Sequence, residues 1–353
     1  MTAEKLPDAA NAGHITEALL HSGMPGSTRV REVETVSSRP TILSRIIRLR
    51  LRYDGAQGNA PDTVILKTGL PERIGSGWQG GAQEVAFYRQ IAAEMRPIAT
   101  PRCFDARWNA TTHDWHLLLE DLTDTHIIAT VWPLPPTTEQ CERIIDAWAR
   151  FHAAWWDDSR LGTSIGTRRD EATTDRILRD LTAHFARFAD RLGDRLSPER
   201  RALYERFLAG APRLLGRSQR RNNVTLNHGD AHMWNVFLPR NGGEDLRLFD
   251  WDGWRIAAAA HDLAYMMALH WSAERRRRLE RPLLDRYHAT LFAHGVRSYD
   301  RASLEEDYRR AVLWQMSTPV WQAAFDIPPA VWWNHLERIL IAVDDLDCRD
   351  LLK

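Results

Sequence analysis

Two short segments in the second half of the chain hold the side chains best suited to chemistry. In residues 228–235, His228, Asp230 and Asn235 follow the pattern His-x-Asp-x-x-x-x-Asn, and Asp250 comes fifteen positions after Asn235. Transfer of a phosphoryl group needs a carboxylate near the attacking hydroxyl, and carboxylate and amide oxygens that hold Mg²⁺. The spacing therefore predicts that Asp230 acts as the base and that Asn235 and Asp250 bind magnesium.

Each of these segments adjoins an apolar run that is expected to form a short strand. The 228–235 loop leads into one run, and Asp250 follows the other. Two strands joined by a turn at 239–245 would place Asn235 and Asp250 side by side. Asp252 is two positions further on, and strand alternation would point it to the same face as Asp250. We expect Asp250 to be the more buried carboxylate and the metal ligand, and a second metal contact from Asp252 stays open.

The rest of the chain divides into a strand-rich first part and a helical remainder. Lys67 would stand at the end of a strand, Glu84 in the first turn of a helix, and Glu120 just after a strand. This order of elements predicts the α+β class. The expected strands are a hairpin within 30–53, then 63–67 and 116–119, and the expected helices are 14–23, 83–95, 138–156, 175–192, 198–208 and much of 272–351.

Five segments resemble motifs of the aminoglycoside phosphotransferase and choline kinase superfamily, and they occur in that family's order. The Glu-Val-x-Phe-Tyr and Glu-Asp-Leu forms are similar to its ecdysteroid-kinase-like branch. The helix at 147–156 also resembles the family's Leu-His-Ala helix. The five segments are Val-Ile-Leu-Lys at 64–67, Glu-Val-Ala-Phe-Tyr at 84–88, Leu-Leu-Glu-Asp-Leu at 118–122, the loop at 228–235 and Phe-Asp-Trp at 249–251.

The resemblance implies a two-lobed, protein-kinase-like fold. Residues 1–120 would form a small nucleotide-binding lobe with an antiparallel sheet and one helix. Residues 121–353 would form a larger, mainly helical lobe that carries the catalytic loop and the acceptor site. At 353 residues the chain exceeds the length at which a single core usually stops growing, which also favours two lobes.

The resemblance further implies transfer of the γ-phosphate of ATP or GTP to a hydroxyl of a small molecule, with Mg²⁺ as cofactor. Lys67 would neutralise the α- and β-phosphates and be oriented by Glu84, while backbone groups from Glu120 to Leu122 would bind the base. Antibiotics, amino alcohols and hydroxylated metabolites all stay open as acceptors, because kinship of fold does not choose among them.

Some features depart from the family pattern. The nucleotide loop of the family often contains glycine, whereas residues 36–44 contain none, so serine hydroxyls would have to contact the phosphates there. Asp252 stands where glycine or glutamine is more usual. Acidic residues at 300–307 and 344–350 offer attraction to a cationic acceptor, although acids in such helices are usually solvated.

Other functions were weighed against this prediction. A catalytically silent, nucleotide-binding pseudokinase is the main alternative, but Lys67, Asp230, Asn235 and Asp250 are all present. A metal hydrolase would need a carboxylate–histidine pair at metalloprotease spacing, and a protein kinase would need a glycine loop and an Ala-Pro-Glu signature. We expect His228 to tie the backbone together rather than do chemistry.

Composition limits the partners and the compartment. Lys and Arg number 47, as do Asp and Glu, so the formal net charge is zero and neither nucleic acid nor a membrane surface is an expected partner. The three cysteines are far apart and odd in number, which indicates no disulfide framework. The first residues lack the apolar core of a signal peptide. We expect a cytoplasmic monomer or homodimer.

Overall fold

The structure is a computed structural model, and it describes residues 7–23, 29–55, 57–71, 79–95, 100–216 and 222–353. Contacts within the chain divide it into two compact units. We call them the sheet unit, Met1–Ile128 with Phe237–Gly253, and the helical unit, Ala129–Val236 with Trp254–Lys353. The division predicted from the sequence, at residue 120, assigns residues 237–253 to the helical part instead.

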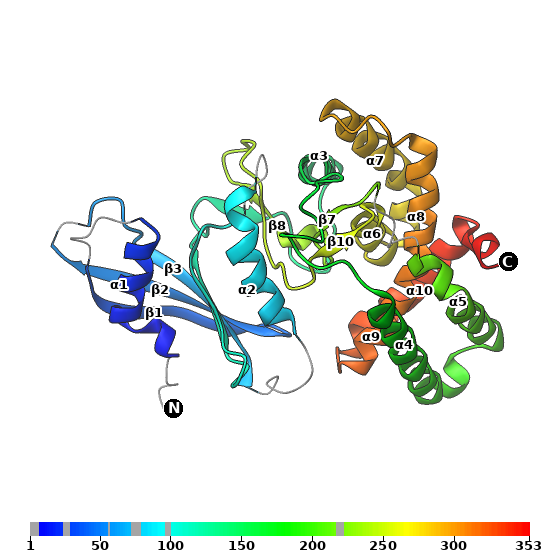
Figure 1. Cartoon of the computed structure of the whole chain (residues 1–353), viewed down its shortest axis with the longest axis horizontal. Helices are drawn as coiled ribbons and strands as arrows, with labels where there is room; N and C mark the ends of the chain where they lie inside the picture. Colours follow the sequence, from blue (N-terminus) through cyan, green and yellow to red (C-terminus); the bar gives the residue numbers. More distant parts are fainter. Residues whose placement is uncertain (1–6, 24–28, 56, 72–78, 96–99, 217–221) are drawn as a thin grey trace. The chain divides into compact units, whose positions relative to one another are not determined.

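The sheet unit is built on five antiparallel strands in the order β1-β2-β3-β5-β4 (Figure 1). Its second sheet has three short strands in the order β6-β8-β9. The helices of this unit are α1 (Ala12–His21) and α2 (Gly80–Gln90). The strands are β1 (Arg29–Pro40), β2 (Ser44–Asp54), β3 (Thr63–Gly69), β4 (Cys103–Trp108), β5 (Trp115–Glu120), β6 (His126–Ile128), β8 (Val236–Pro239) and β9 (Arg247–Leu248).

Alternation along β3 decides which side chains meet which helix. Val64 and Leu66 are fully buried in one apolar cluster with Ile15 and Leu19 of α1. Successive residues of a strand point to opposite faces, so Lys67 points away from α1. The same strand therefore contributes to the core on one face and presents a charged side chain on the other.

The start of α2 corrects one prediction. Glu84 is the fifth residue of a helix that begins at Gly80, so it does not lie in the first turn. The helix starts earlier because glycine permits close packing: a Cβ on Gly81 would lie 2.4 Å from Nε1 of Trp115, and one on Gly69 would lie 2.7 Å from the same atom. Lys67 is likewise two residues short of the end of β3.

The helical unit contains eight α-helices among the described residues and a two-stranded antiparallel pair (Figure 1). Four of its helices begin at side-chain caps. The Thr137 side chain, for example, accepts the Gln140 N–H, and Gln140 reaches back in a capping box. The helices are α3 (Thr138–Ala154), α4 (Glu171–Leu192), α5 (Pro198–Gly216), α6 (Ala260–Ala264), α7 (Ala273–Ala293), α8 (Arg301–Gln315), α9 (Ser317–Ala324) and α10 (Pro329–Asp345), and the strands are β7 (Thr225–Asn227) and β10 (Arg255–Ala257).

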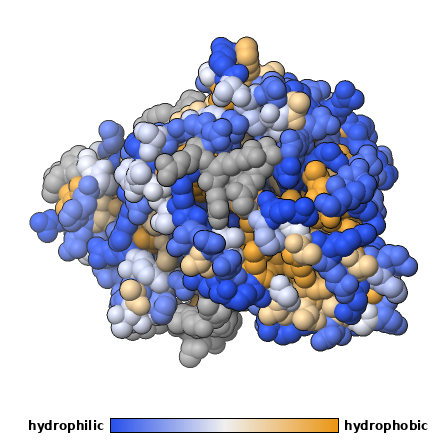
Figure 2. Space-filling view, turned by 45° about the vertical axis from the view of Figure 1, so that its right-hand side comes forward, coloured by the Kyte–Doolittle hydropathy of each residue, from blue (hydrophilic) through white to orange (hydrophobic). Residues whose placement is uncertain are grey.

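These elements confirm the predicted α+β class, with an antiparallel sheet first and mainly helices afterwards. Figure 2 shows one face of the molecule, which is mostly hydrophilic and is interrupted by groups of hydrophobic residues. Within the described part of the chain, no helix combines the length and the apolar character that crossing a membrane would require.

Candidate active site

Lys67 of the sheet unit is held between two carboxylates that come from different segments. Its Nζ lies 2.7 Å from Oε2 and 2.9 Å from Oε1 of Glu84 in α2. The same Nζ lies 2.5 Å from Oδ1 of Asp250, which follows β9. Lys67 and Glu84 are buried, with 8% and 1% of their surfaces exposed, and the Asp250 side chain is 36% exposed. The expected pairing of Lys67 with Glu84 is therefore present.

The charges of this cluster do not balance. Burial alone would lower the pKa of Lys67, but the charges of Asp250, Glu84 and Asp252 raise it above its ordinary value. Burial, together with the charge of Asp250, raises the pKa of Glu84 despite the opposing effect of Lys67. One ammonium thus faces three carboxylates, and the surplus negative charge favours binding of a divalent cation.

Trp251 fixes the acidic segment against α2. Its ring stacks on Phe87 with centroids 4.0 Å apart and planes 6° apart. Its Nε1–H donates to Oγ1 of Thr100 at 3.1 Å and to the Leu248 carbonyl at 3.2 Å. In the sequence, Trp251 stands out only as the last residue of the Phe-Asp-Trp segment. No pattern in the sequence near Trp251 indicates that it stacks on Phe87, which lies 164 positions earlier in the chain.

Asp250 and Asp252 are both half-buried, so the expectation that Asp250 is the more buried of the two stays a prediction. Strand alternation does not extend to them, because β9 ends at Leu248 and Asp250 has a positive φ of 71°. A left-handed residue reverses the local direction of the chain, so the two-residue period of a strand no longer predicts where each carboxylate points.

The predicted base-binding segment lies at the end of β5. Oε1 of Glu120 accepts the Arg102 N–H at 2.8 Å and a guanidinium N–H of Arg247 at 3.0 Å, which holds this side chain away from other partners. The carbonyl of Leu122 accepts the His126 N–H at 2.8 Å. Among the described residues, no partner is found for the Leu122 N–H. That backbone donor fits the predicted contact with a nucleotide base.

In the helical unit, the predicted catalytic loop brings Asp230 and Asn235 into contact. The Asn235 side-chain nitrogen donates to Oδ2 of Asp230 at 3.0 Å and to the Asp230 carbonyl at 2.9 Å. This orientation leaves the amide oxygen of Asn235 as the atom that can bind a cation. His228 ties the loop together as expected, because its Nδ1 accepts the Asp230 N–H at 3.3 Å.

Asp262 holds the backbone of the predicted catalytic loop in place. Its carboxylate accepts the His228 N–H at 2.7 Å and the Gly229 N–H at 3.0 Å, and it also accepts from Nε2 of His152 at 3.2 Å. Burial would raise the pKa of Asp262, but the bond from His152 and the nearby positive charges hold it below its ordinary value. Asp262 is inside α6 and not at its N-cap, which is Ala259.

Three histidines that are far apart in the sequence, His232, His270 and His335, form a group beside Asp230. Nε2 of His232 lies 3.4 Å from Oδ2 of Asp230, the His232 and His270 ring centroids are 5.2 Å apart, and those of His270 and His335 are 4.6 Å apart. Burial lowers the pKa of His270 and lowers that of His335 to about 3. These two rings are therefore neutral at pH 7.

A further polar cluster, in the sheet unit, was not predicted from the sequence. Oδ2 of Asp105 accepts from Nε2 of His14 at 2.9 Å and of His116 at 2.8 Å, and these three groups lie close enough to hold a metal ion. Nε of Arg107 lies 3.0 Å from the same oxygen and already balances its charge. We interpret the cluster as a link that ties α1 to β4 and β5.

Comparison with known proteins identifies the family. The model of the ecdysteroid kinase-like family matches residues 41–297, which is more than half of the chain. No curated protein is similar enough in sequence to be identified as a relative. This match agrees with the family branch that the sequence motifs resemble.

Solved structures share the fold at low sequence identity. A provisionally assigned aminoglycoside phosphotransferase from Ralstonia eutropha JMP134 has a TM-score of 0.61 at 11% identity, over 96% of this chain and 98% of that chain. An ethanolamine kinase from Plasmodium vivax has a TM-score of 0.59 at 11% identity, over 96% and 89%. A choline kinase from Cryptosporidium parvum Iowa II has a TM-score of 0.57 at 11% identity, over 97% and 98%. These likenesses confirm the predicted kinase-like fold.

Proposed function

Because the chain belongs to the ecdysteroid kinase-like family, we propose that it transfers the γ-phosphate of ATP or GTP to a hydroxyl of a small molecule. The observation that carries the proposal is the position of Lys67, whose ammonium is shared by Glu84 and Asp250. A buried lysine beside a metal-binding carboxylate is the arrangement that nucleotide phosphates and their magnesium require.

The sheet unit supplies the groups that bind the nucleotide. Lys67 neutralises charge on the α- and β-phosphates, and Glu84 keeps its ammonium in place. The Leu122 N–H, next to Glu120 and its anchored side chain, contacts the base. Residues 1–120 and 121–353 remain our proposal for the nucleotide-binding and catalytic lobes.

The helical unit supplies the groups that act on the acceptor. Asp230 accepts the proton of the acceptor hydroxyl as the oxygen attacks the γ-phosphorus, while the bond from that phosphorus to the β,γ-bridging oxygen breaks and the nucleoside diphosphate leaves. His228 and Asp262 hold the loop so that the Asp230 carboxylate keeps its position.

The residues fit a magnesium ion. Asp250 offers a half-exposed carboxylate in a cluster with surplus negative charge, and Asn235 offers an amide oxygen whose nitrogen is already engaged. Oxygen ligands of this kind, one or two from the protein, are what Mg²⁺ takes beside phosphate and water. A Mg²⁺ held by these residues would neutralise charge on the nucleotide phosphates.

A cytoplasmic location and a monomeric or homodimeric state belong to the same proposal. The three cysteines are unpaired thiols, and Cys141 and Cys348 are buried, which suits a reducing compartment.

The test is a screen of the purified chain with ATP or GTP and magnesium against hydroxylated antibiotics, amino alcohols and metabolites, read as the mass gain of one phosphate. Lys67→Ala should weaken nucleotide binding or slow transfer, and Glu84→Ala should act in the same direction through lost orientation of the lysine. Nucleotide binding that does not depend on magnesium, with no transfer to any acceptor, would support a pseudokinase instead.

A further inference from the structure

A pocket within the helical unit lies against the predicted catalytic loop. It has a volume of about 250 Å³ and includes Gly229, the residue before Asp230, in its wall. Ligand pockets for drug-sized molecules begin near about 300 Å³, so this space suits a compact molecule or one end of a larger one. Its other lining residues include two arginines and three aromatic side chains: Arg169, Arg255, Tyr265, Trp314 and Trp321.

The two arginines give the pocket a positive potential that nearby acids do not cancel at Arg169. Burial and the charge of Arg255 lower the pKa of Arg169 to about 10, and no carboxylate acts in the opposite direction. Among the described residues, Arg169 forms no ion pair or hydrogen bond. Burial and the charges of both arginines also lower the pKa of the neighbouring His261 to about 3. A partly buried guanidinium without an anionic partner is an unusual feature for a folded protein, because desolvation of its charge is not offset.

The hydroxyl groups of Ser317 and Thr318, on the α8–α9 side of the pocket, already donate hydrogen bonds within the protein. Oγ1 of Thr318 donates to Oε1 of Gln315 at 2.6 Å, and Oγ of Ser317 donates to the Trp314 carbonyl at 2.7 Å. Arg169 is therefore the strongest donor left for a ligand, and the indole rings of Trp314 and Trp321 offer flat apolar walls.

The acidic residues that offered attraction to a cationic acceptor have partners of their own. Asp345 pairs with Arg276 and with Arg277, whose Nε is 2.7 Å away. Asp300 caps α8 by accepting the Ser303 N–H at 2.7 Å. These contacts remove the main sequence-based reason to expect a cationic acceptor.

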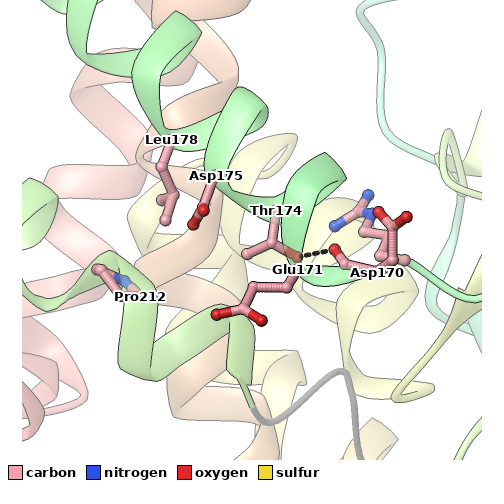
Figure 3. Close-up of a pocket in the computed structure, with 7 residues that line it drawn as sticks. Asp170, Glu171, Thr174, Asp175, Leu178 and Pro212 are labelled. Carbon is pink, nitrogen blue, oxygen red and sulfur yellow. Dashed lines mark hydrogen bonds between the residues drawn. The ribbon is translucent and has the colours of Figure 1, made fainter.

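Arg169 also lines a second pocket, which is acidic but does not compete as a binding site (Figure 3). It is lined by Asp170, Glu171 and Asp175 at the start of α4. The Asp170 side chain caps that helix by accepting the Thr173 N–H at 2.8 Å, and its carbonyl accepts from Thr174 at 2.9 Å. Nothing further in the described residues indicates a ligand there.

On the basis of the proposed kinase function, we propose that the acceptor is an organic anion: a compact hydroxylated molecule whose carboxylate, or a similar oxyanion, pairs with Arg169 and Arg255 while a flat apolar part lies against Trp314 and Trp321. A planar guanidinium binds a carboxylate through two parallel N–H bonds, which gives orientation as well as affinity. With the anionic end fixed in this pocket beside Gly229, a hydroxyl elsewhere on the molecule can be presented to Asp230.

The test uses three acceptors that share one hydroxymethyl-substituted ring and carry a negative, no or a positive charge: 3-(hydroxymethyl)benzoate, its methyl ester, and 3-(hydroxymethyl)benzylamine. Binding to the full chain without nucleotide is measured by calorimetry, and phosphorylation with MgATP by mass. We expect the benzoate to bind roughly 10- to 100-fold more tightly than the ester, as for other charge-assisted hydrogen bonds, and the amine to bind most weakly. Equal binding of the three, tighter binding of the amine, or no binding of the benzoate would overturn the proposal.

Two variants decide whether the pocket is responsible. Arg169→Gln should remove most of the preference for the benzoate, whereas Arg179→Gln, which makes the same charge change at an exposed position of α4, should leave it unchanged. An unchanged preference in Arg169→Gln would also overturn the proposal. MgATP affinity, measured in the same variants, should match that of the wild type. If the benzoate binds through Arg169 but no acceptor is ever phosphorylated, the proposed function fails while the anion site stands.

Discussion

The sheet unit and the helical unit hold their predicted functional side chains in different ways. In the sheet unit, Lys67, Glu84 and Asp250 contact one another directly, so the functional groups are also the groups that position each other. In the helical unit, the loop that carries Asp230 is held by Asp262, a residue with no predicted chemical role. A substitution in the first cluster should therefore change binding and geometry together. In the helical unit, substitutions of Asp230 and of Asp262 can separate the effect on chemistry from the effect on the position of the loop.

The largest effect is expected where one side chain has two tasks. Asp250→Ala removes both the proposed metal ligand and a partner of Lys67, so we expect magnesium-dependent transfer to be lost and MgATP affinity to fall. Asp252→Ala is the matched control, because the negative charge of Asp252 also raises the pKa of Lys67. Titration of magnesium against activity in both variants measures the difference. A larger loss in Asp252→Ala would assign the metal to the other carboxylate.

Asp230→Asn should separate chemistry from binding in the helical unit. We expect turnover to fall by about 100- to 10,000-fold, the usual contribution of a positioned general base. Nucleotide affinity should change little, because the acceptor-side carboxylate contributes mainly at the transition state. Single-turnover rates and calorimetric binding of nucleotide give the two quantities. Turnover near that of the wild type would remove Asp230 from the role of base.

Asp262→Asn tests positioning alone. The amide keeps one acceptor oxygen for two backbone donors, so we expect a loss of stability of about 1–3 kcal/mol and a smaller loss of turnover than in Asp230→Asn. Denaturant unfolding and turnover of both variants, measured in parallel, make the comparison. Equal losses of turnover would indicate that Asp262 does more than hold the loop.

The pH dependence of stability follows from the same carboxylate. The pKa of Asp262 is lower in the folded chain than in the unfolded chain, so its contribution is fully present above an unfolded-state pKa of about 4. It is lost as the pH falls through the folded-state value. The wild type should therefore lose more stability than Asp262→Asn on acidification below about pH 4, as measured by denaturant unfolding at a series of pH values.

The sequence predicted the order of the elements and the partners that share a motif, but not the residues that hold motifs together. Lys67 was predicted to pair with Glu84 because both segments resemble family motifs, and Asp230 and Asn235 were assigned to one loop because of their spacing. The stacking of Trp251 on Phe87 and the cluster around Asp105 join positions far apart in the chain, where no periodicity connects them. The expectation that Asp250 and Asp252 point to the same face relied on strand alternation, which does not reach them because β9 ends at Leu248 and Asp250 is left-handed.

The smallest effect is expected from a substitution in the sheet unit that changes no charged side chain. It tests whether the position of Asp250 can be perturbed through Trp251 alone. Trp251→Phe keeps an aromatic ring to stack on Phe87 but removes the N–H that donates to Thr100 and to the Leu248 carbonyl. We expect a loss of stability of about 1 kcal/mol, the net worth of a typical hydrogen bond. Because the ring still holds the segment, Asp250 should shift only slightly, so the KM for MgATP should rise a few-fold at most with kcat nearly unchanged. Trp108→Phe, the same substitution in β4, is the control and should leave KM at the wild-type value. A fall in kcat as large as that of Asp230→Asn would mean that the hydrogen bonds of Trp251, rather than the contacts among Lys67, Glu84 and Asp250, set the geometry of this cluster.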